Sequence, residues 1–339
     1  MSNTKGSPSN GLTRREFLVA TSASAAGLAL AGQATAQDQK KPVTIGTGKW
    51  TYTLVEGWPV MPEGVNLQMG CAVVVDSRDR IYVHSQAAKN VVVFDRMGKP
   101  IKDWGMSLDK AAHGTYLHRE GTDEFLFFSI LGPFNQIVKT DLDGKVLLRI
   151  GNVPEENSTN VKFPFNNPTD VAVAPNGDIW VCEGYGGQKV HRFNAQGKFI
   201  QTVGESGTGP GQFRTPHGIW IDTRKTEHEV WVADRSNSRL QIFDMDGKLK
   251  RQVKEGIRNP CCFYQYRDVL FVPDLDKVVS IIDRDDKVVA QLGDGKLFTD
   301  ESGFKAPHAL TIDSHGDLYV VEWVADGRLR KYKRTPIKT

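Results

Sequence analysis

The feature that most constrains the fold is a pattern of four short apolar segments that recurs along the chain. Its clearest copy spans residues 168–204 and opens with Pro168. Four apolar runs follow, the first at 171–173 and the last at 199–203, and turn residues separate them. Asn-Gly and similar glycine-containing pairs between such runs are typical of β-hairpins. Each copy is therefore predicted to form an antiparallel four-stranded sheet.

Five further copies share this order, and one residue marks the start of the first strand in each copy. These six equivalent residues are Cys71, His113, Thr169, His217, Cys261 and His308. They are 42 to 56 residues apart, and a period of about 40–50 residues with four short strands per copy is the signature of a β-propeller. A β-sandwich would not explain six copies at this spacing. The sequence thus predicts an all-β fold, a six-bladed β-propeller.

The ring of blades needs a closing strand, because the sixth copy stops after three strands, near Tyr332. The segment 49–54 alternates apolar and polar residues, as a strand with one buried face does. We predict that this N-terminal strand completes the sixth sheet, since closure of this kind hides an exposed strand edge. The propeller is accordingly assigned to residues 49–335.

The first 36 residues have the features of an export signal. They contain the pair Arg14-Arg15, a mildly apolar run at 19–32 and the small-residue motif Ala34-Thr35-Ala36, which together are typical of a twin-arginine signal peptide. The apolar run is too short and too rich in Ser, Thr and Gly for a transmembrane anchor. We predict a signal peptide at 1–36, a linker at 37–48, passage through the twin-arginine translocation machinery, and a periplasmic or secreted protein. Whether the signal is cleaved after Ala36 or kept as a tether is left open.

Charge and cysteine content argue against a nucleic-acid-binding protein and against a structural zinc knuckle. The chain has 43 Lys and Arg against 40 Asp and Glu, and this balance without a basic run argues against nucleic acid as a partner. The cysteines Cys71, Cys182, Cys261 and Cys262 contain no C-x-x-C pair, so no structural zinc knuckle is predicted. An oxidising compartment permits disulfides, and the sequence does not decide which cysteines, if any, are paired. The oligomeric state is open too.

Histidine occupies every second position of the six equivalent residues, as His113, His217 and His308. Residues at the starts of the innermost strands of a propeller face the central channel at one end, so these three side chains are expected to converge. Three neutral imidazoles with one open position form the ligand set of a catalytic zinc site. The alternative is that each histidine only caps or solvates a strand end, which does not explain their alternation.

A second set of candidate residues follows the second strands of two neighbouring copies. Tyr185 comes after such a strand in the third copy and Arg235 in the fourth. Tyr185 is a candidate general base if a metal ion or Arg235 lowers its pKa from about 10, and the planar fork of Arg235 suits a carboxylate. The alternative is that Tyr185 packs a blade while Arg235 pairs with Glu183 or Asp234.

These repeats resemble the NHL family and, within it, the peptidyl-α-hydroxyglycine α-amidating lyases. The resemblance spans about residues 65–335 and is strongest at 165–245. The stretches that carry it are Pro168-Thr169-Asp170-Val171-Ala172-Val173, Glu183-Gly184-Tyr185, Pro210-Gly211-Gln212-Phe213, Pro216-His217, Ala233-Asp234-Arg235-Ser236-Asn237-Ser238-Arg239 and Pro307-His308. The resemblance implies a zinc ion (Zn2+) held by His113, His217 and His308, with Tyr185 and Arg235 as catalytic residues.

Four positions depart from the pattern of those lyases. Ser85 lies near the place of a second active-site arginine, and Ala306 replaces a methionine beside the last zinc ligand. Ala309 replaces the acidic residue of the lyases' calcium (Ca2+) site, and Gly186 replaces a disulfide cysteine. The resemblance therefore includes the zinc ligands and the Tyr–Arg pair, whereas the departures concern the calcium site and the binding of a peptide substrate.

The sequence thus favours an exported zinc-dependent lyase that cleaves the C–N bond of an N-acyl-α-hydroxyglycine-like carbinolamide to an amide and glyoxylate. Tyr185 would help to remove the proton of the substrate hydroxyl, and Arg235 would orient a carboxylate. The expected substrate is a small molecule or short peptide that carries a carboxylate. Two alternatives stay open, because fold does not imply function: a non-catalytic NHL propeller that binds a ligand or protein, and a metal-dependent lactonase-like hydrolase.

Overall fold

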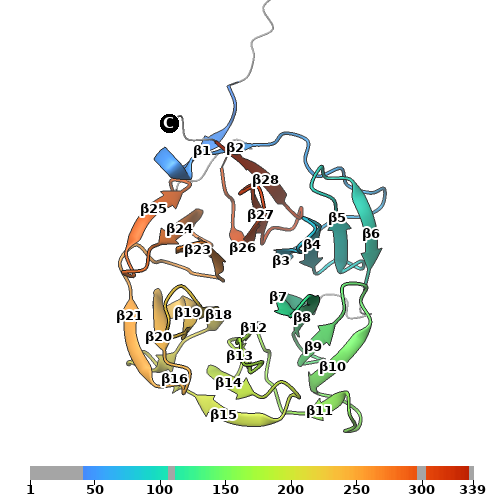
Figure 1. The fold of residues 1–339 in the computed structure, drawn as a ribbon, viewed down its shortest axis with the longest axis vertical. Coiled ribbons are helices and arrows are strands. Elements are labelled where there is room, and N and C mark those ends of the chain that lie inside the picture. Colours follow the sequence, from blue (N-terminus) through green and yellow to red (C-terminus); the bar gives the residue numbers. More distant parts are fainter. Residues whose placement is uncertain (1–40, 106–110, 296–302, 336–339) are drawn as a thin grey trace, which may run out of the picture. The chain divides into compact units, whose positions relative to one another are not determined.

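The computed structural model describes residues 41–105, 111–295 and 303–335. Six small antiparallel sheets surround a central axis, and the chain passes from one to the next in sequence order (Figure 1). The helical elements among the described residues are two single-turn 3-10 helices, η1 (Gly48–Trp50) and η2 (Arg235–Asn237). The predicted six-bladed propeller is confirmed.

Each of the first three blades begins with its innermost strand. Blade one comprises β3 (Gly70–Val75), β4 (Ile81–Ser85), β5 (Val91–Phe94) and β6 (Pro100–Trp104). Blade two comprises β7 (Ala112–Glu120), β8 (Asp123–Ile130), β9 (Gln136–Thr140) and β10 (Val146–Gly151), with β11 (Asn160–Lys162) parallel to β10. Blade three comprises β12 (Asp170–Val173), β13 (Ile179–Glu183), β14 (Lys189–Phe193) and β15 (Phe199–Val203).

The other three blades repeat this order. Blade four comprises β18 (Pro216–Asp222), β19 (Glu229–Asp234), β20 (Arg239–Phe243) and β21 (Leu249–Val253), and a short parallel pair, β16 (Glu205–Ser206) and β17 (Gln212–Phe213), precedes it. Blade five comprises β22 (Tyr264–Tyr266), β23 (Val269–Asp274), β24 (Val278–Ile282) and β25 (Val288–Leu292). Blade six has β26 (Pro307–Ile312), β27 (Leu318–Glu322) and β28 (Leu329–Arg334) from the end of the chain.

The sixth blade is closed by an N-terminal strand, as the sequence predicts. Strand β2 (Tyr52–Leu54) pairs with β28 in antiparallel register, with Tyr52 opposite Arg334. Two details differ from the prediction. Residues 48–50 form η1 instead of the start of the strand, and β1 (Thr44–Ile45) pairs with β2 within the segment 37–48 that was assigned to a linker. Gly46 and Gly48, both with positive φ, make the turn that allows this short hairpin.

The repeats share one device at their outer hairpins. In five blades a side-chain oxygen accepts the backbone N–H groups two and four residues further on, at distances of 2.8 to 3.0 Å. The five acceptor residues are Asp95, Asp141, Asn194, Asp244 and Asp283. Such Asx turns fix the hairpin locally, which explains why Asp and Asn recur at these turns.

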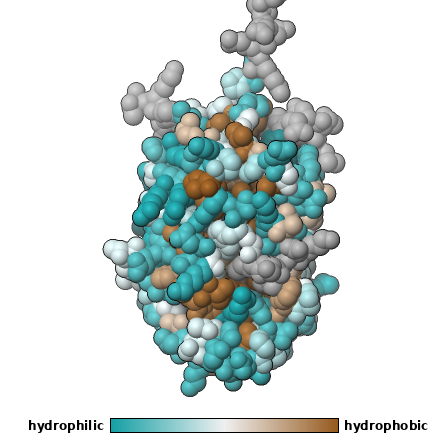
Figure 2. Space-filling view, turned by 90° about the vertical axis from the view of Figure 1, so that its right-hand side faces the viewer, coloured by the Kyte–Doolittle hydropathy of each residue, from teal (hydrophilic) through white to brown (hydrophobic). Residues whose placement is uncertain are grey.

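The hydrophobic core lies between neighbouring sheets. Trp180 of blade three packs in one cluster with residues of blade four, and Tyr319 of blade six packs with residues of blade one. The outer strands are polar in comparison, and the side face in Figure 2 is mostly hydrophilic with separate hydrophobic patches. This packing holds the innermost strands, and therefore the residues at their starts, in a fixed ring around the axis.

Tyr52 links closure to stability, because it is fully buried in the cluster that joins blades five and six. We expect Tyr52→Ala to lower the free energy of unfolding by about 3–5 kcal/mol, the usual cost of truncating a buried aromatic side chain. Tyr52→Phe should be close to neutral, since the buried hydroxyl has no hydrogen-bond partner among the described residues. Urea unfolding of the two variants checks this, and equal stabilities would contradict the role of β2 in closure.

The predicted signal peptide at 1–36 lies outside the described residues. No helix in the described part of the chain is long and apolar enough to cross a membrane. All four cysteines are free thiols. The structure thus leaves the export prediction untested and contains no disulfide among these cysteines.

Candidate metal centre

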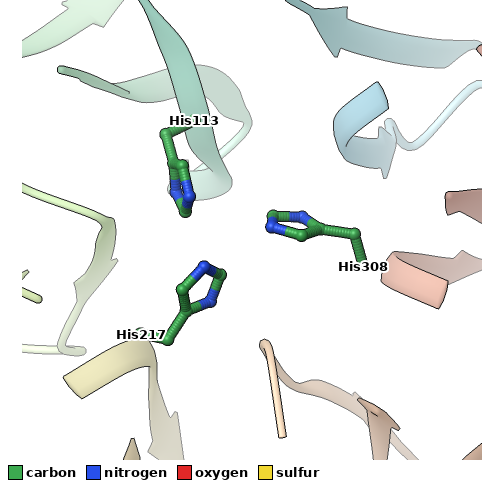
Figure 3. Close-up of side chains that lie close together, drawn as sticks. All are labelled: His113, His217 and His308. Carbon is green, nitrogen blue, oxygen red and sulfur yellow. The ribbon is translucent and has the colours of Figure 1, made fainter. Parts of the chain in front are cut away.

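Three alternate blades each contribute one histidine to the axis. His113 lies in β7, His217 in β18 and His308 in β26, and the three rings point toward one another across the channel (Figure 3). Their ring centroids are 4.6 to 5.2 Å apart. One nitrogen from each lies within 4.8 Å of the other two. The structure therefore brings together all three histidines that the alternating pattern singled out.

The other nitrogen of each ring is held by the backbone of the next blade. The Nδ1 atoms of His113, His217 and His308 lie 2.5, 2.8 and 2.6 Å from carbonyl oxygens of Thr169, Cys261 and Cys71, respectively. Because a carbonyl only accepts, each Nδ1 must carry the proton, which leaves the lone pair on Nε2. The three non-histidine positions of the sequence ring thus orient the histidines, in the way that outer partners orient metal ligands.

The three rings are neutral at ordinary pH. All are at least 97% buried, and burial is the largest cause that lowers their pKa values. The pKa of His308 falls from 6.5 to about 4, and those of His113 and His217 fall well below 6.5. Neutral imidazole is the form that binds metal ions.

This burial makes the stability of the metal-free protein depend on pH. Between about pH 6.5 and 4 the unfolded chain binds the proton that buried His308 refuses, so the stability that His308 confers is lost as the pH falls. We expect urea unfolding of chelated protein to show this loss, and His308→Gln to show a shallower one. Asp170, whose pKa burial raises to about 7, contributes the opposite slope equally to both proteins. Identical slopes would contradict the expectation.

The donor set fits a metal ion. Three buried, neutral, pre-oriented imidazoles are a ligand set of zinc, which binds nitrogen at about 2.0–2.1 Å and keeps a fourth position open in catalytic sites. Within the described residues, this is the one group of three or more His, Cys, Asp or Glu side chains close enough to share an ion. The cluster could therefore hold a metal ion, and zinc is one of the ions that imidazole ligands suit.

Tyr185 and Arg235 lie against this cluster. The Tyr185 hydroxyl is 3.2 Å from Nε2 of His113 and 3.0 Å from Nε2 of His217. Arg235 donates to the same hydroxyl at 3.4 Å, and its guanidinium lies 5.3 Å from the centre of the tyrosine ring. Tyr185 is 41% exposed overall, so one side of its ring faces solvent while its hydroxyl faces the histidines. Burial raises the pKa of Tyr185, and Arg235 opposes this rise.

The alternative pairings considered for Arg235 do not occur. Asp234 pairs with Arg239 at 2.7 Å, and Glu183 contacts His191 at 3.3 Å. Within the described part of the chain, Arg235 makes no ion pair. Its charge is therefore available to a bound anion beside the histidines.

Two buried carboxylates fix the segments that lead into the second and third ligands. Asp234 accepts the backbone N–H of Arg214 at 2.8 Å, just before His217. Glu322 accepts the backbone N–H of Ala306 at 3.0 Å, just before His308. Both carboxylates are fully buried and end the second strand of their blade. They hold the strand starts, and so the ligands, in place.

Tyr185 and Arg235 belong to a second ring of six equivalent residues, which we call the mouth residues. Each donates its backbone N–H to the carbonyl that lies two positions before the ring residue of the same blade, at 2.7 to 3.5 Å. In blade order the mouth residues are Gln86, Leu131, Tyr185, Arg235, Leu275 and Trp323. Trp323, which sequence analysis did not single out, stacks on His308 with ring centroids 5.4 Å apart. Its place after the second strand of the last repeat was the signal that could have found it.

Two of the four positions that depart from the amidating lyases, Ser85 and Gly186, can be described from their surroundings. Ser85 is buried, its N–H donates to the carbonyl of Asn90, and its Oγ lies 3.4 Å from the N–H of Ala87. Position 85 therefore supplies no positive charge, unlike the arginine of the amidating lyases. A Cβ atom on Gly186 would lie 2.1 Å from the exposed Asn166 side chain, so a cysteine would fit here only if Asn166 moved. Arg235 is thus the only charged mouth residue.

An axial cavity of about 510 Å³ lies on the other side of the histidines. The innermost strands line it, with Tyr116, Trp220 and Tyr264 among the larger side chains. Tyr185, Arg235 and Trp323 are absent from its lining. The Tyr185 hydroxyl, which lies beside two Nε2 atoms, thus meets the histidines on the side of the mouth residues and not in this cavity.

Comparisons with known proteins agree with this fold. A family described as a 6-bladed β-propeller matches residues 158–274. The human NHL repeat-containing protein 3 is 30% identical over 208 residues, which cover 59% of this chain and 58% of that protein. The Drosophila melanogaster peptidyl-α-hydroxyglycine α-amidating lyase 2 is 26% identical over 254 residues, which cover 68% of this chain and 57% of that protein. The chain thus spans less than two thirds of the length of either relative.

A solved structure extends the comparison of folds. Virginiamycin B lyase from Staphylococcus aureus superimposes with a TM-score of 0.53 and 13% sequence identity, over 79% of this chain and 97% of that one. At this identity the likeness concerns the fold alone. Together with the sequence relatives, it agrees with the NHL-type propeller expected from the repeats.

Proposed function

We propose that this six-bladed propeller of the NHL type is a metal-dependent lyase that cleaves N-acyl-α-hydroxyglycines, or similar carbinolamides, to an amide and glyoxylate. The observation that carries the proposal is the placement of the Tyr185 hydroxyl beside the Nε2 atoms of His113 and His217, with Arg235, which makes no ion pair with a described residue, next to it. This combines a ligand set, a proton carrier and an anion site within one mouth. The name of the Drosophila relative supports the same class of reaction.

Each residue has a distinct task in this reaction. His113, His217 and His308 would hold a zinc ion, which supplies a Lewis acid that lowers the pKa of a substrate hydroxyl. Arg235 binds the carboxylate through its planar donor fork. Tyr185 would act as the phenolate, stabilised by Arg235 and by the charge of a bound metal ion against the burial that raises its pKa, and would take the hydroxyl proton as the C=O bond of glyoxylate forms and the C–N bond breaks. The proton returned to the amide nitrogen completes the balance, so that no water is consumed.

Localisation and partners are part of the proposal. The Arg14-Arg15 pair and the motif at 34–36 support export by the twin-arginine machinery, which would place the lyase in the periplasm or outside the cell. The substrate is proposed to be a small acylated molecule or short peptide with one free carboxylate, because Arg235 is the one cationic mouth residue.

Product analysis tests the proposal. Metal-loaded protein is incubated with N-benzoyl-α-hydroxyglycine, and benzamide and glyoxylate are quantified against spontaneous breakdown in buffer. We expect the two products in equal amounts and at a rate well above the background. Hydrolysis of a γ-lactone without glyoxylate release would instead favour the lactonase-like alternative. If neither substrate reacts, the lyase proposal is wrong and a binding propeller takes its place.

A further inference from the structure

Trp323 is a mouth residue that is held both by its backbone and by its side chain. Its backbone N–H donates to the carbonyl of Ala306 at 2.9 Å. Its indole stacks on His308 at an interplanar angle of 29°, and its centroid is 6.4 Å from that of His113. The side chain is nevertheless only partly buried. Trp323 thus presents a rigid aromatic surface at the edge of the histidine cluster.

The order of the mouth residues places Trp323 opposite Tyr185. Tyr185 belongs to blade three and Trp323 to blade six, and these blades face each other across the axis (Figure 1). Tyr185 covers the side of His113 and His217, whereas Trp323 covers the side of His308 and His113. The proton carrier and the indole therefore flank the reactive position from opposite sides.

The reacting carbon of an α-hydroxyglycine carries a hydroxyl, a carboxylate and an acylated nitrogen, and each of these groups needs its own position in the site. The hydroxyl has to meet the histidine cluster beside Tyr185, and the carboxylate has to meet Arg235. Four mouth residues remain for the acylated nitrogen, namely Gln86, Leu131, Leu275 and Trp323. Of these, Trp323 is the one whose aromatic ring lies against the histidines, so we place the acyl group on its side. An indole is a broad, flat surface that pairs well with another ring or with apolar chain.

We propose, on the basis of the lyase function above, that Trp323 determines acyl-group specificity and that substrates with an aromatic acyl group are preferred over those with a small one. N-benzoyl-α-hydroxyglycine represents the preferred class and N-acetyl-α-hydroxyglycine the disfavoured one. An aromatic contact at a fixed surface corresponds to about a tenfold preference.

The experiment compares wild type, Trp323→Ala, Trp323→Phe and the control Val324→Ala. Val324 is the next residue, also partly buried, and its recorded hydrogen bonds use only the backbone. For each protein we measure metal content, kcat/KM for both α-hydroxyglycines, and calorimetric binding of N-benzoylglycine and N-acetylglycine, which lack the hydroxyl and cannot be cleaved. We expect the benzoyl preference to fall about tenfold in Trp323→Ala, and to persist in Trp323→Phe and Val324→Ala, with metal content unchanged.

The cleavage rates test the lyase function, and the calorimetric affinities test the contact with Trp323 independently of cleavage. If wild type cleaves both substrates and Trp323→Ala keeps the benzoyl preference, Trp323 does not select the acyl group while the lyase function stands. If wild type cleaves neither, the lyase function fails, and calorimetry alone decides the role of Trp323. In that case, tighter binding of N-benzoylglycine that disappears in Trp323→Ala supports the aromatic site, and equal binding in both proteins overturns it.

Discussion

Replacing His217 by alanine is expected to remove the metal ion from the protein while the propeller stays folded. His217 is one of three ligands, and its Nε2 lone pair is left available by the bond between Nδ1 and the carbonyl of Cys261. Loss of a partner that only orients a ligand typically costs about 10–100-fold in metal affinity. Loss of the ligand itself should cost more, so purified His217→Ala should contain less than about a tenth of the wild-type metal.

The matched control is His315→Ala, because His315 is an exposed histidine whose one recorded ion pair, at 3.9 Å, is with Asp79. It should keep the full metal content and the wild-type circular dichroism spectrum. Metal analysis of the purified proteins, beside melting curves, decides the matter. Full metal retention in a folded His217→Ala protein would mean that the ion, if any, binds elsewhere.

Tyr185→Phe should separate catalysis from metal binding. The phenolic hydroxyl contacts His113 and His217 at Nε2 and accepts from Arg235, while the three histidines by themselves offer three ligand atoms to an ion. The variant should therefore keep its metal. Because a positioned proton carrier contributes about 10²–10⁴-fold to rate, we expect kcat for glyoxylate release to fall by that factor, with a smaller change in KM.

Tyr116→Phe provides the control for this change. Tyr116 lines the axial cavity on the far side of the histidines, and its hydroxyl donates to the carbonyl of Val173 at 3.4 Å. Its removal should leave kcat within about twofold of wild type. A Tyr185→Phe protein that is as active as Tyr116→Phe would exclude the phenol from the reaction.

The architecture could be predicted because each repeat contains the same four strands and the same turn residues, so that every blade folds in the same way. Turn residues such as Asn194 and Asp244 recur at the same hairpin and fix it locally. The convergence of His113, His217 and His308 followed from their equivalent positions, since closing a ring of repeats turns equal sequence positions into equal spatial positions. The strand at the N-terminus was found from the missing edge of the last repeat.

What could not be predicted depends on backbone geometry that the residue types do not reveal. The tautomer of the ligands is set by carbonyl groups of Cys71, Thr169 and Cys261, and any residue supplies a carbonyl. Trp323 was missed because the sequence does not show its stacking on His308, although it follows the second strand of its repeat as Tyr185 and Arg235 follow theirs. The start of β2 was placed too early because Gly46 and Gly48 bend the chain before the strand begins.

The most direct test of the account is a zinc titration of chelated wild-type protein, with glyoxylate release from N-benzoyl-α-hydroxyglycine as the readout. The three histidines form one cluster, so activity should be absent without metal, rise in proportion to added Zn2+ and saturate at one equivalent per chain. Full activity in the chelated protein, or no glyoxylate after one equivalent has bound, would contradict the claim that this cluster is the metal centre of a lyase.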